Sequence, residues 1–256
     1  MVSKVDMNAD MGESFGDWVM GNDAALLDVV TSANIACGFH AGDPDVMAKT
    51  MGLAMQKGVG LGAHPGFADL QGFGRRRLPM SDESLRNLIA YQIGAAQGMA
   101  RACGGALNHL KLHGALSNMA SDDLEMARVC LRAVQAVAPD LVVMVLAGTA
   151  LQQAAEELGC AWAGEIFADR AYHDDATLVG RDQKGAVIHD AQVAAKRVLE
   201  MVQNDAIIAV SGKKIPVRID TICVHGDTPN AIEIARAVRA ALEGDNIAVT
   251  RLAVRG

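Results

Sequence analysis

The sequence has few aromatic residues, no excess of positive charge and no long apolar run. Phe, Trp and Tyr make up 4% of its 256 residues, and 23 Lys and Arg against 30 Asp and Glu give a net charge of −7. This balance argues against broad electrostatic binding to nucleic acids or membranes, which needs a basic surface. No stretch approaches the roughly 18 apolar residues of a membrane helix. Asp6 and Asp10 stand where a signal peptide would need an apolar core, so a cytoplasmic protein is expected.

The sequence also lacks paired cysteines, the common phosphate-binding loop and the helical zinc-protease motif. Its five cysteines are scattered without a C-x-x-C pair, which argues for a reducing compartment and against a disulfide framework or zinc knuckle. Cys37 lies in a polar segment and is the cysteine that we would test for function. There is no G-x-x-x-x-G-K-[ST] or H-E-x-x-H motif. If the protein takes part in ATP chemistry, it does so without a standard phosphate-binding loop.

Short apolar runs alternate with helical patterns along the whole chain. Strands are expected at residues 4–10, 31–37, 59–64, 108–113, 141–147, 161–168, 220–225 and 246–253. Helices are expected near residues 22–30, 44–57, 82–103, 122–137, 149–158, 189–203 and 229–243. An alternation of this kind predicts a parallel sheet covered by helices, which is the α/β class.

The number of βα units and the length favour one closed, irregular (β/α) barrel over a doubly wound open sheet. Apolar residues make up 51% of the chain, and no segment stands apart from the rest in composition. Residues 1–256 are therefore expected to form a single domain. Residues 206–219 interrupt the alternation. They have the pattern of two short strands around the turn Ser211-Gly212-Lys213-Lys214, which predicts an inserted β-hairpin.

Histidines gather at the ends of the predicted strands. Four of the seven lie at or just beyond the C-terminal end of an apolar run, namely His40, His64, His113 and His225. In (β/α) barrels these strand ends converge on the active site. A single strand-end histidine is usually a loop-capping residue, but the coincidence of several favours a functional site.

Polar residues also alternate with apolar ones along the strands, and alternate residues share one face of a strand. The polar faces are Asp6, Asn8 and Asp10; His109, Lys111 and His113; Glu165 and Asp169; and Cys223, His225 and Asp227. In a barrel covered by helices, these faces would meet the lumen. Because unpaired ions in a dry lumen would cost several kcal/mol each, we expect a solvated, functional pocket.

A basic run, Arg75-Arg76-Arg77, follows Gly72-Phe73-Gly74 on a predicted loop after the third strand. Such a loop could clamp a carboxylate or a phosphate. A solvated run of surface charge is the alternative interpretation.

Six segments together resemble the LamB/YcsF family: NADMGESFGDW, SANIACGFHAGDP, GLGAHPGFADLQGFGRR, LKLHGALSN, EIFADRAY and ICVHGDTP. The resemblance runs from about residue 4 to residue 250. The sequence departs from the family pattern at Leu112 and Ser117, where Pro and Tyr are expected. Both departures keep the spacing of Lys111 and His113.

The resemblance implies a seven-stranded barrel similar to that of the polysaccharide deacetylases. It also implies that the chain is one subunit, called A, of a prokaryotic ATP-dependent 5-oxoprolinase, in which 5-oxo-L-proline, ATP and two waters give L-glutamate, ADP and phosphate. The expected partners are subunits B and C. Which subunit holds ATP stays open.

Opening an unactivated lactam needs a general base, for which histidine is suited, and stabilisation of a developing oxyanion. We expect Asp10 with His64 or His40 to orient or deprotonate water, and Lys111 and His113 to stabilise the oxyanion or phosphate. The substrate-binding residues expected are Asn8, Arg75, Arg76, Glu165, Asp169, Arg170, His225 and Asp227, with an arginine binding the carboxylate or phosphate.

Three alternatives compete with this hypothesis. Asp10, His40 and His64 could form a divalent metal site in a metal-dependent deacetylase or amidohydrolase. Lys111 could form a Schiff base in an aldolase or lyase. The chain could also be a non-catalytic subunit that binds the substrate and hands it to another chain.

Overall fold

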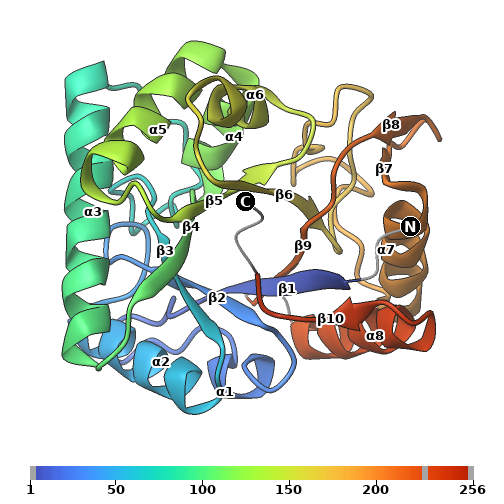
Figure 1. Cartoon of the computed structure of the whole chain (residues 1–256), viewed down its shortest axis with the longest axis horizontal. Coiled ribbons are helices and arrows are strands. Elements are labelled where there is room, and N and C mark those ends of the chain that lie inside the picture. Colours follow the sequence, from blue (N-terminus) through green and yellow to red (C-terminus); the bar gives the residue numbers. More distant parts are fainter. Residues whose placement is uncertain (1–3, 227–229, 253–256) are drawn as a thin grey trace.

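Seven parallel strands close into a barrel in the computed structural model, which describes residues 4–226 and 230–252. In hydrogen-bonded order they are β1 (Lys4–Met11), β2 (Ser32–Ala36), β3 (Gly60–His64), β4 (Leu107–Lys111), β5 (Val142–Leu146), β6 (Trp162–Phe167) and β9 (Thr221–His225). β9 pairs with β1, from Thr221 opposite Asp6 to His225 opposite Asp10, and so closes the barrel. Figure 1 shows the helices outside this ring of strands. The predicted seven-stranded (β/α) barrel is confirmed.

Helices cover the outside of the barrel. They are α1 (Asp23–Leu26), α2 (Pro44–Gln56), α3 (Asp82–Ala102), α4 (Gly114–Asp122), α5 (Leu124–Val137), α6 (Ala150–Glu157), α7 (Ala191–Asn204) and α8 (Ala231–Gly244). Asp43 caps α2 by accepting hydrogen bonds from two backbone N–H groups of its first turn, next to Pro44. Within the described residues, no helix combines the length and the apolarity that a membrane crossing needs.

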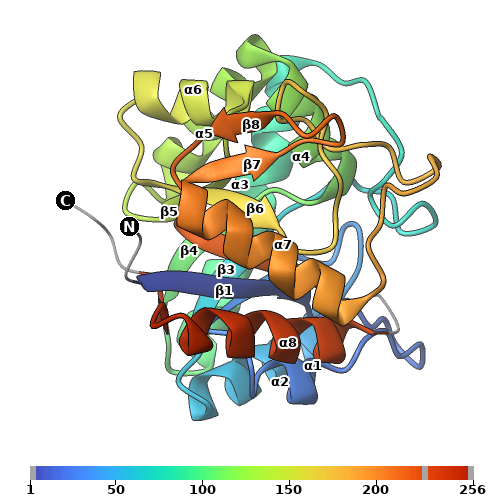
Figure 2. The same cartoon turned by 90° about the vertical axis from the view of Figure 1, so that its right-hand side faces the viewer.

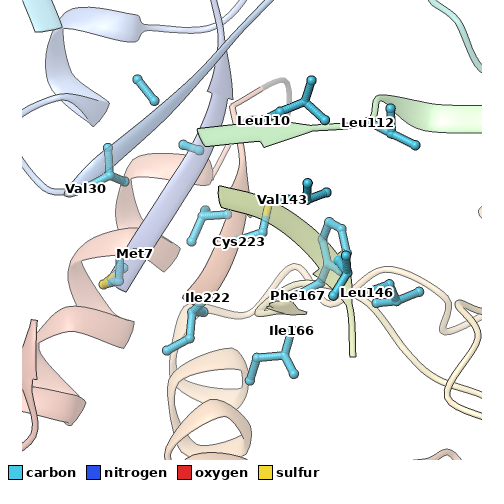
Figure 3. Packing of buried hydrophobic residues seen from close by; sticks show 14 of the residues in the cluster. Met7, Val30, Leu110, Leu112, Val143, Leu146, Ile166, Phe167, Ile222 and Cys223 are labelled. Atoms are coloured by element: carbon cyan, nitrogen blue, oxygen red, sulfur yellow. The ribbon is translucent and has the colours of Figure 1, made fainter. Parts of the chain in front are cut away.

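Successive residues of a barrel strand point alternately toward the helices and into the lumen. Ile166 on β6 and Ile222 on β9 lie opposite each other in register, and Figure 3 shows them on the helix-facing side of the strands. The polar residues between the apolar ones face the lumen, as predicted. Gly62 makes this arrangement possible, because a Cβ at that position would overlap the imidazole ring of His109. Any other side chain at position 62 would therefore displace a lumen residue.

The inserted hairpin predicted at 206–219 is also confirmed. It consists of β7 (Ala206–Ile208) and β8 (Lys214–Pro216), which pair in antiparallel fashion. The turn between them includes Gly212 at a φ of +87°, which glycine tolerates and other residues rarely adopt.

Three elements differ from the sequence-based expectation. The helix expected at 22–30 is a single turn, α1, and the strand expected at 246–253 is β10 (Ala248–Val249), two residues paired with the start of β1. Helix α4 was not expected at all. Its buried residues are Ala115, Leu116, Ala120 and Ser121, so it offers no long apolar stripe that a helical period would reveal.

Candidate active site

A pocket of about 230 Å³ opens at the C-terminal end of the barrel. Strand ends, the loops after them and helix α4 supply its lining, which includes Asp10, His64, Arg75, Lys111, His113, Ser117, Asn118, Phe167, Arg170, Arg181 and His225. In Figure 2, β1 points to the right, and the loops that follow the strands gather on that side, away from the two termini. The pocket therefore lies at the barrel end that holds the active site in (β/α) enzymes.

Lys111 is the charged centre of the pocket. Its Nζ lies 2.9 Å from Asp10 Oδ1 and 2.9 Å from Glu165 Oε1. Cys223 Sγ lies at the same distance, and the Phe167 ring centre is 4.8 Å away. Burial alone would lower the pKa of Lys111, but the attractions of Asp10, Cys223 and Glu165 together outweigh burial and raise that pKa well above its ordinary value. The side chain is thus a fixed ammonium, which argues against the Schiff-base lyase, since that chemistry needs a neutral amine.

Asp10 presents its two carboxylate oxygens to different partners. Oδ1 accepts from Lys111 and, at 2.9 Å, from Nδ2 of Asn34. Oδ2 lies 3.4 Å from Nε2 of His64. Burial alone would raise the pKa of Asp10, but His64 and the Lys111 ammonium hold it well below its ordinary range. Asp10 is therefore ionised at neutral pH, with Oδ2 on the side of the imidazoles.

Beneath the pocket, the polar groups of the lumen bond to one another. Nδ2 of Asn8 donates to Glu165 at 3.0 Å, and Nδ2 of Asn34 donates to Oδ1 of Asn8 at 2.7 Å. Nε2 of His109 lies 2.9 Å from Oδ1 of Asn34. Burial and then the nearby Lys111 lower the pKa of His109 to about 3, so this ring is neutral. The lower lumen is thus a hydrogen-bonded network in which Nδ1 of His109 is left without a partner among the described residues, and the pocket lies above it.

Three histidines and one glutamate form a buried cluster beside Asp10, called here the imidazole cluster: Glu13, His40, His64 and His113. The His40 and His113 rings stack with centroids 3.6 Å apart, and the His64 ring meets both at 90°. Oε1 of Glu13 lies 3.3 Å from His40 Nε2 and 3.8 Å from His113 Nδ1. Burial and then repulsion between the rings lower the pKa of His40 and of His113 well below the ordinary value.

Two backbone carbonyls set the tautomers of His64 and His113. Nδ1 of His64 lies 2.8 Å from the carbonyl oxygen of Lys111, and Nε2 of His113 lies 2.8 Å from that of Phe73. A carbonyl oxygen only accepts, so a ring that carries a single proton holds it on these nitrogens. In that state the other two nitrogens, His64 Nε2 and His113 Nδ1, carry lone pairs, and they face each other at 3.0 Å.

The described residues hold two groups of side chains that could bind a metal ion. The imidazole cluster is the larger, with donor atoms all within 4.8 Å of one another. Asp10 belongs to the second group, with Cys223 and His225. The triad expected from Asp10, His40 and His64 is therefore divided, because His40 faces Glu13 while Asp10 approaches His64.

His225 forms part of the pocket wall. Its Nδ1 lies 2.8 and 2.9 Å from the two carboxylate oxygens of Asp169, and its ring stacks on Phe167 with centroids 5.0 Å apart. Burial alone would raise the pKa of Asp169, but the neighbouring His225 lowers it. The carboxylate and the aromatic ring together hold the imidazole in one orientation.

Three arginines from two loops contribute positive charge to the pocket. The Arg75 guanidinium lies over the Phe73 ring, 4.9 Å from its centre. Arg170 donates to the carbonyl of Val179 at 2.5 Å, and burial lowers its pKa to about 10, which leaves it charged at neutral pH. Arg181 is the third. A small anion entering the pocket would therefore meet guanidinium groups as well as the Lys111 ammonium.

The structure places most of the predicted site residues in or directly behind the pocket. Asn8, His40, Glu165 and Asp169 are buried behind the lining and contact it. Arg76 is different: its side chain is 61% exposed, pairs with Asp69 and does not line the pocket. Asp227 lies outside the described residues.

Glu13, Phe167 and Arg181 are among the site residues that the sequence analysis missed. Glu13 follows the end of β1 in the NADMGESFGDW segment, so an acidic residue just past a strand end was its signal. The alternation on β6 pointed to Phe167, whereas nothing in the sequence distinguishes Arg181. Cys37, by contrast, bonds to the carbonyl of Ile35 at 3.5 Å, and burial raises its pKa to about 12. It is thus an unreactive buried thiol.

Comparison with known proteins gives consistent matches over the whole length. The LamB/YcsF family model matches residues 5–255. A protein of Ruegeria pomeroyi, named as the A subunit of 5-oxoprolinase, is 62% identical over 249 residues, which cover 97% of this chain and 98% of that protein.

Solved structures agree with these matches. The crystal structure of the lactam utilization protein from Thermus thermophilus superposes with a TM-score of 0.91 at 44% identity, over 98% of this chain and all of the other. The T48 deacetylase, solved with substrate, has a TM-score of 0.51 at 12% identity and covers 98% of this chain and 89% of its own. This second likeness concerns the fold alone.

Proposed function

Because the chain belongs to the LamB/YcsF family, we propose that it is the barrel subunit of an ATP-dependent 5-oxoprolinase and carries the site where the lactam opens. The reaction converts 5-oxo-L-proline to L-glutamate and ATP to ADP and phosphate. The supporting observation is a small pocket that holds a fixed ammonium, Lys111, together with arginines, in a chain 62% identical to a protein named as a 5-oxoprolinase subunit.

The pocket suits a small anionic lactam. Its volume of about 230 Å³ is below the roughly 300 Å³ at which pockets for drug-sized molecules begin. 5-Oxo-L-proline is a five-membered ring with one carboxylate, for which Arg75 and Arg181 are suitable partners. With the carboxylate on that side, the lactam carbonyl oxygen points toward Lys111, which stabilises negative charge on it. The pocket is small for a whole nucleotide, so ATP would bind at the level of the complex.

The chemistry requires two waters and one phosphoryl transfer. The γ-phosphoryl group of ATP passes to the lactam carbonyl oxygen, which releases ADP. Water then adds to the ring carbon, the C–N bond breaks, and the nitrogen takes up a proton as the leaving amine. The resulting acyl phosphate of glutamate reacts with the second water to give glutamate and phosphate.

The residues on the pocket floor have different roles in this reaction. Lys111 balances the charge that develops on the carbonyl and phosphate oxygens. Asp10 Oδ2 orients the attacking water, but a carboxylate with so low a pKa is a weak base. Activation of that water therefore falls to the imidazole cluster beside it, while the Asp169–His225 pair supports the opposite wall.

Reconstitution tests the proposal. The chain is co-expressed with the two further subunits of the enzyme, and glutamate formed from 5-oxo-L-proline is measured with and without ATP. We expect glutamate release that requires this chain, both partners and ATP. A complex of the partners alone that releases glutamate at the same rate would show that this chain does not carry the reaction.

Arg75 provides a prediction about substrate binding. Arg75→Ala should raise the KM for 5-oxo-L-proline by about 10- to 100-fold, the range for a lost charged hydrogen bond, and change kcat less. Arg77→Ala is the matched control, since Arg77 is two residues away but pairs with Asp122 outside the pocket. An unchanged KM for the Arg75 variant would contradict carboxylate binding there.

The loop between β1 and α1 provides a prediction about assembly. Trp18 and Val19 in this loop are 77% and 86% exposed, and it leaves the barrel at the pocket end. We expect the paired change Trp18→Ser and Val19→Ser to weaken co-purification with the partner subunits at least about tenfold, as for an aromatic interface residue. Val210→Ser, an apolar and exposed position on the inserted hairpin, is the control. Equal recovery of all variants would place the interface elsewhere.

A metal-dependent amidohydrolase that needs no ATP is the second candidate, because the imidazole cluster gathers metal-ligating groups. One simple assay distinguishes the two candidate functions. If the isolated chain hydrolyses amides without ATP or partners, the second candidate holds and the first fails.

A further inference from the structure

The imidazole cluster contains an arrangement that neutral side chains cannot satisfy alone. When both rings are neutral, lone pairs of His64 Nε2 and His113 Nδ1 face each other at 3.0 Å, because backbone carbonyls hold both ring protons. Two lone pairs at hydrogen-bonding distance repel unless a positive centre lies between or beside them. A third acceptor, Oε1 of Glu13, lies 3.8 Å from His113 Nδ1. Three electron-pair donors thus converge on one point.

We propose that His64 Nε2, His113 Nδ1 and the Glu13 carboxylate bind one divalent transition-metal ion, with zinc as the reference ion. In a tetrahedral site with bonds of 2.0–2.1 Å, neighbouring ligand atoms lie about 3.4 Å apart. The observed separations of 3.0 and 3.8 Å lie on either side of that value. Two imidazoles and one carboxylate are a ligand set that zinc accepts, and three protein ligands leave a coordination position open.

The groups around His64 and His113 are arranged like those that surround the ligands of known metal sites. Metal-bound histidines normally donate their second ring N–H to a carbonyl or carboxylate, as both rings do here. Phe73, whose carbonyl accepts from His113, has a φ of +53°, an unfavourable conformation for a non-glycine residue. At Gly74, a Cβ would lie 2.8 Å from Cδ2 of His113 and 2.7 Å from Cβ of His40. Backbone strain and a glycine thus both serve to place these rings.

His40 has a positioning role in this arrangement. It stacks on the His113 ring and directs Nε2 to Glu13 at 3.3 Å, where it can donate a hydrogen bond to the carboxylate. Its Nδ1 is buried and has no hydrogen-bond partner among the described residues. A ligating His40 would need a proton on that unpartnered nitrogen, so the structure favours His40 as the residue that holds Glu13.

The proposed ion adjoins the pocket, since His64 and His113 both line it. Asp10 Oδ2 lies 3.4 Å from His64 Nε2, close enough to orient a water at the open position. A zinc ion held there would lower the pKa of a bound water to about 7 and would so supply the activation that the weakly basic Asp10 lacks. This role of the ion rests on the proposed function, whereas the metal site itself does not.

The test measures metal directly, on the full-length chain without a polyhistidine tag. After treatment with chelator and dialysis against zinc, elemental analysis should find about one ion per chain. Glu13→Gln and His113→Ala should each weaken zinc binding by at least a hundredfold, as measured by isothermal titration calorimetry. His173→Ala is the control, because His173 lies outside the cluster.

Cobalt(II) gives a second readout that does not depend on activity. Co²⁺ in the wild-type site should show the intense visible absorption of four-coordinate cobalt, and Glu13→Gln, which keeps the side-chain shape, should change that spectrum. Failure of the wild type to bind either ion at micromolar concentration would overturn the proposal. So would metal binding that both variants leave unchanged, which would move the ion to other ligands. Because neither measurement uses 5-oxoproline, a negative result here would leave the proposed function standing.

Discussion

Lys111→Met in the assembled enzyme should reduce glutamate formation from 5-oxo-L-proline by about a thousandfold, the upper range for removal of one oxyanion-stabilising group. Nζ of Lys111 is the positive charge closest to both Asp10 and Glu165 and faces the pocket. The variant keeps the length of the side chain but removes the ammonium. A coupled assay for glutamate, with saturating ATP, measures the loss.

The same change should also destabilise the barrel, which complicates its interpretation. Removing Lys111 takes the ammonium partner from two buried carboxylates, Asp10 and Glu165, and breaking a buried ion pair costs about 3–5 kcal/mol. A second variant separates stability from catalysis: Lys111→Met combined with Glu165→Gln removes one of the stranded charges. We expect the double variant to melt higher than the single one and to remain inactive. Recovery of turnover along with stability would show that Lys111 is only structural.

Asp10→Asn should lower kcat by about a thousandfold, within the range for loss of a group that positions or transfers a proton, with a smaller change in KM. The substitution keeps the shape and the hydrogen bond from Lys111 but removes the charge that faces His64. Steady-state kinetics on the reconstituted complex measure the effect, after circular dichroism has shown a folded chain.

Asp6 is the matched control for this variant. It lies on the same face of β1 as Asp10 but in the lower lumen, where it accepts hydrogen bonds from Ser32 and Thr221. Burial raises the pKa of Asp6, so asparagine resembles the protonated form that burial favours. Asp6→Asn should leave kcat within about threefold of wild type, as expected for a change away from the reacting groups. Equal losses in the two variants would show that the effect of Asp10→Asn is structural.

The strand faces could be predicted from the sequence because their pattern is local. Alternation with a period of two assigns Asp6, Asn8 and Asp10 to one side of β1 without knowledge of any other element. Strand-end histidines were informative for a related reason, since all parallel strands of a barrel end at the same edge. The family resemblance, now confirmed by the family model, rested on these same segments.

The remaining features depend on how distant segments meet. Arg75 and Arg76 are neighbours in one loop, and only the fold shows that Arg75 enters the pocket while Arg76 pairs with Asp69. The division of Asp10, His40 and His64 between two groups also depends on three dimensions, because Glu13 takes His40 as its partner.

The meaning of the chain's acidity changes with the structure. The net charge of −7 describes the sequence as a whole, but several carboxylates are not on the surface. Asp10, Glu165 and Asp169 are buried and pair with Lys111 and His225. Their carboxylates hold these two side chains in place at the pocket.

One structure determination tests the central claim most directly: the complex of this chain with its partner subunits, bound to 5-oxo-L-proline and a non-hydrolysable ATP analogue. We predict the lactam in the barrel pocket, with its ring carbonyl next to Nζ of Lys111 and its carboxylate next to Arg75 or Arg181. The nucleotide phosphates should approach from the open side of the pocket. A lactam bound in one of the partners, with the barrel pocket empty at saturating substrate, would contradict the account.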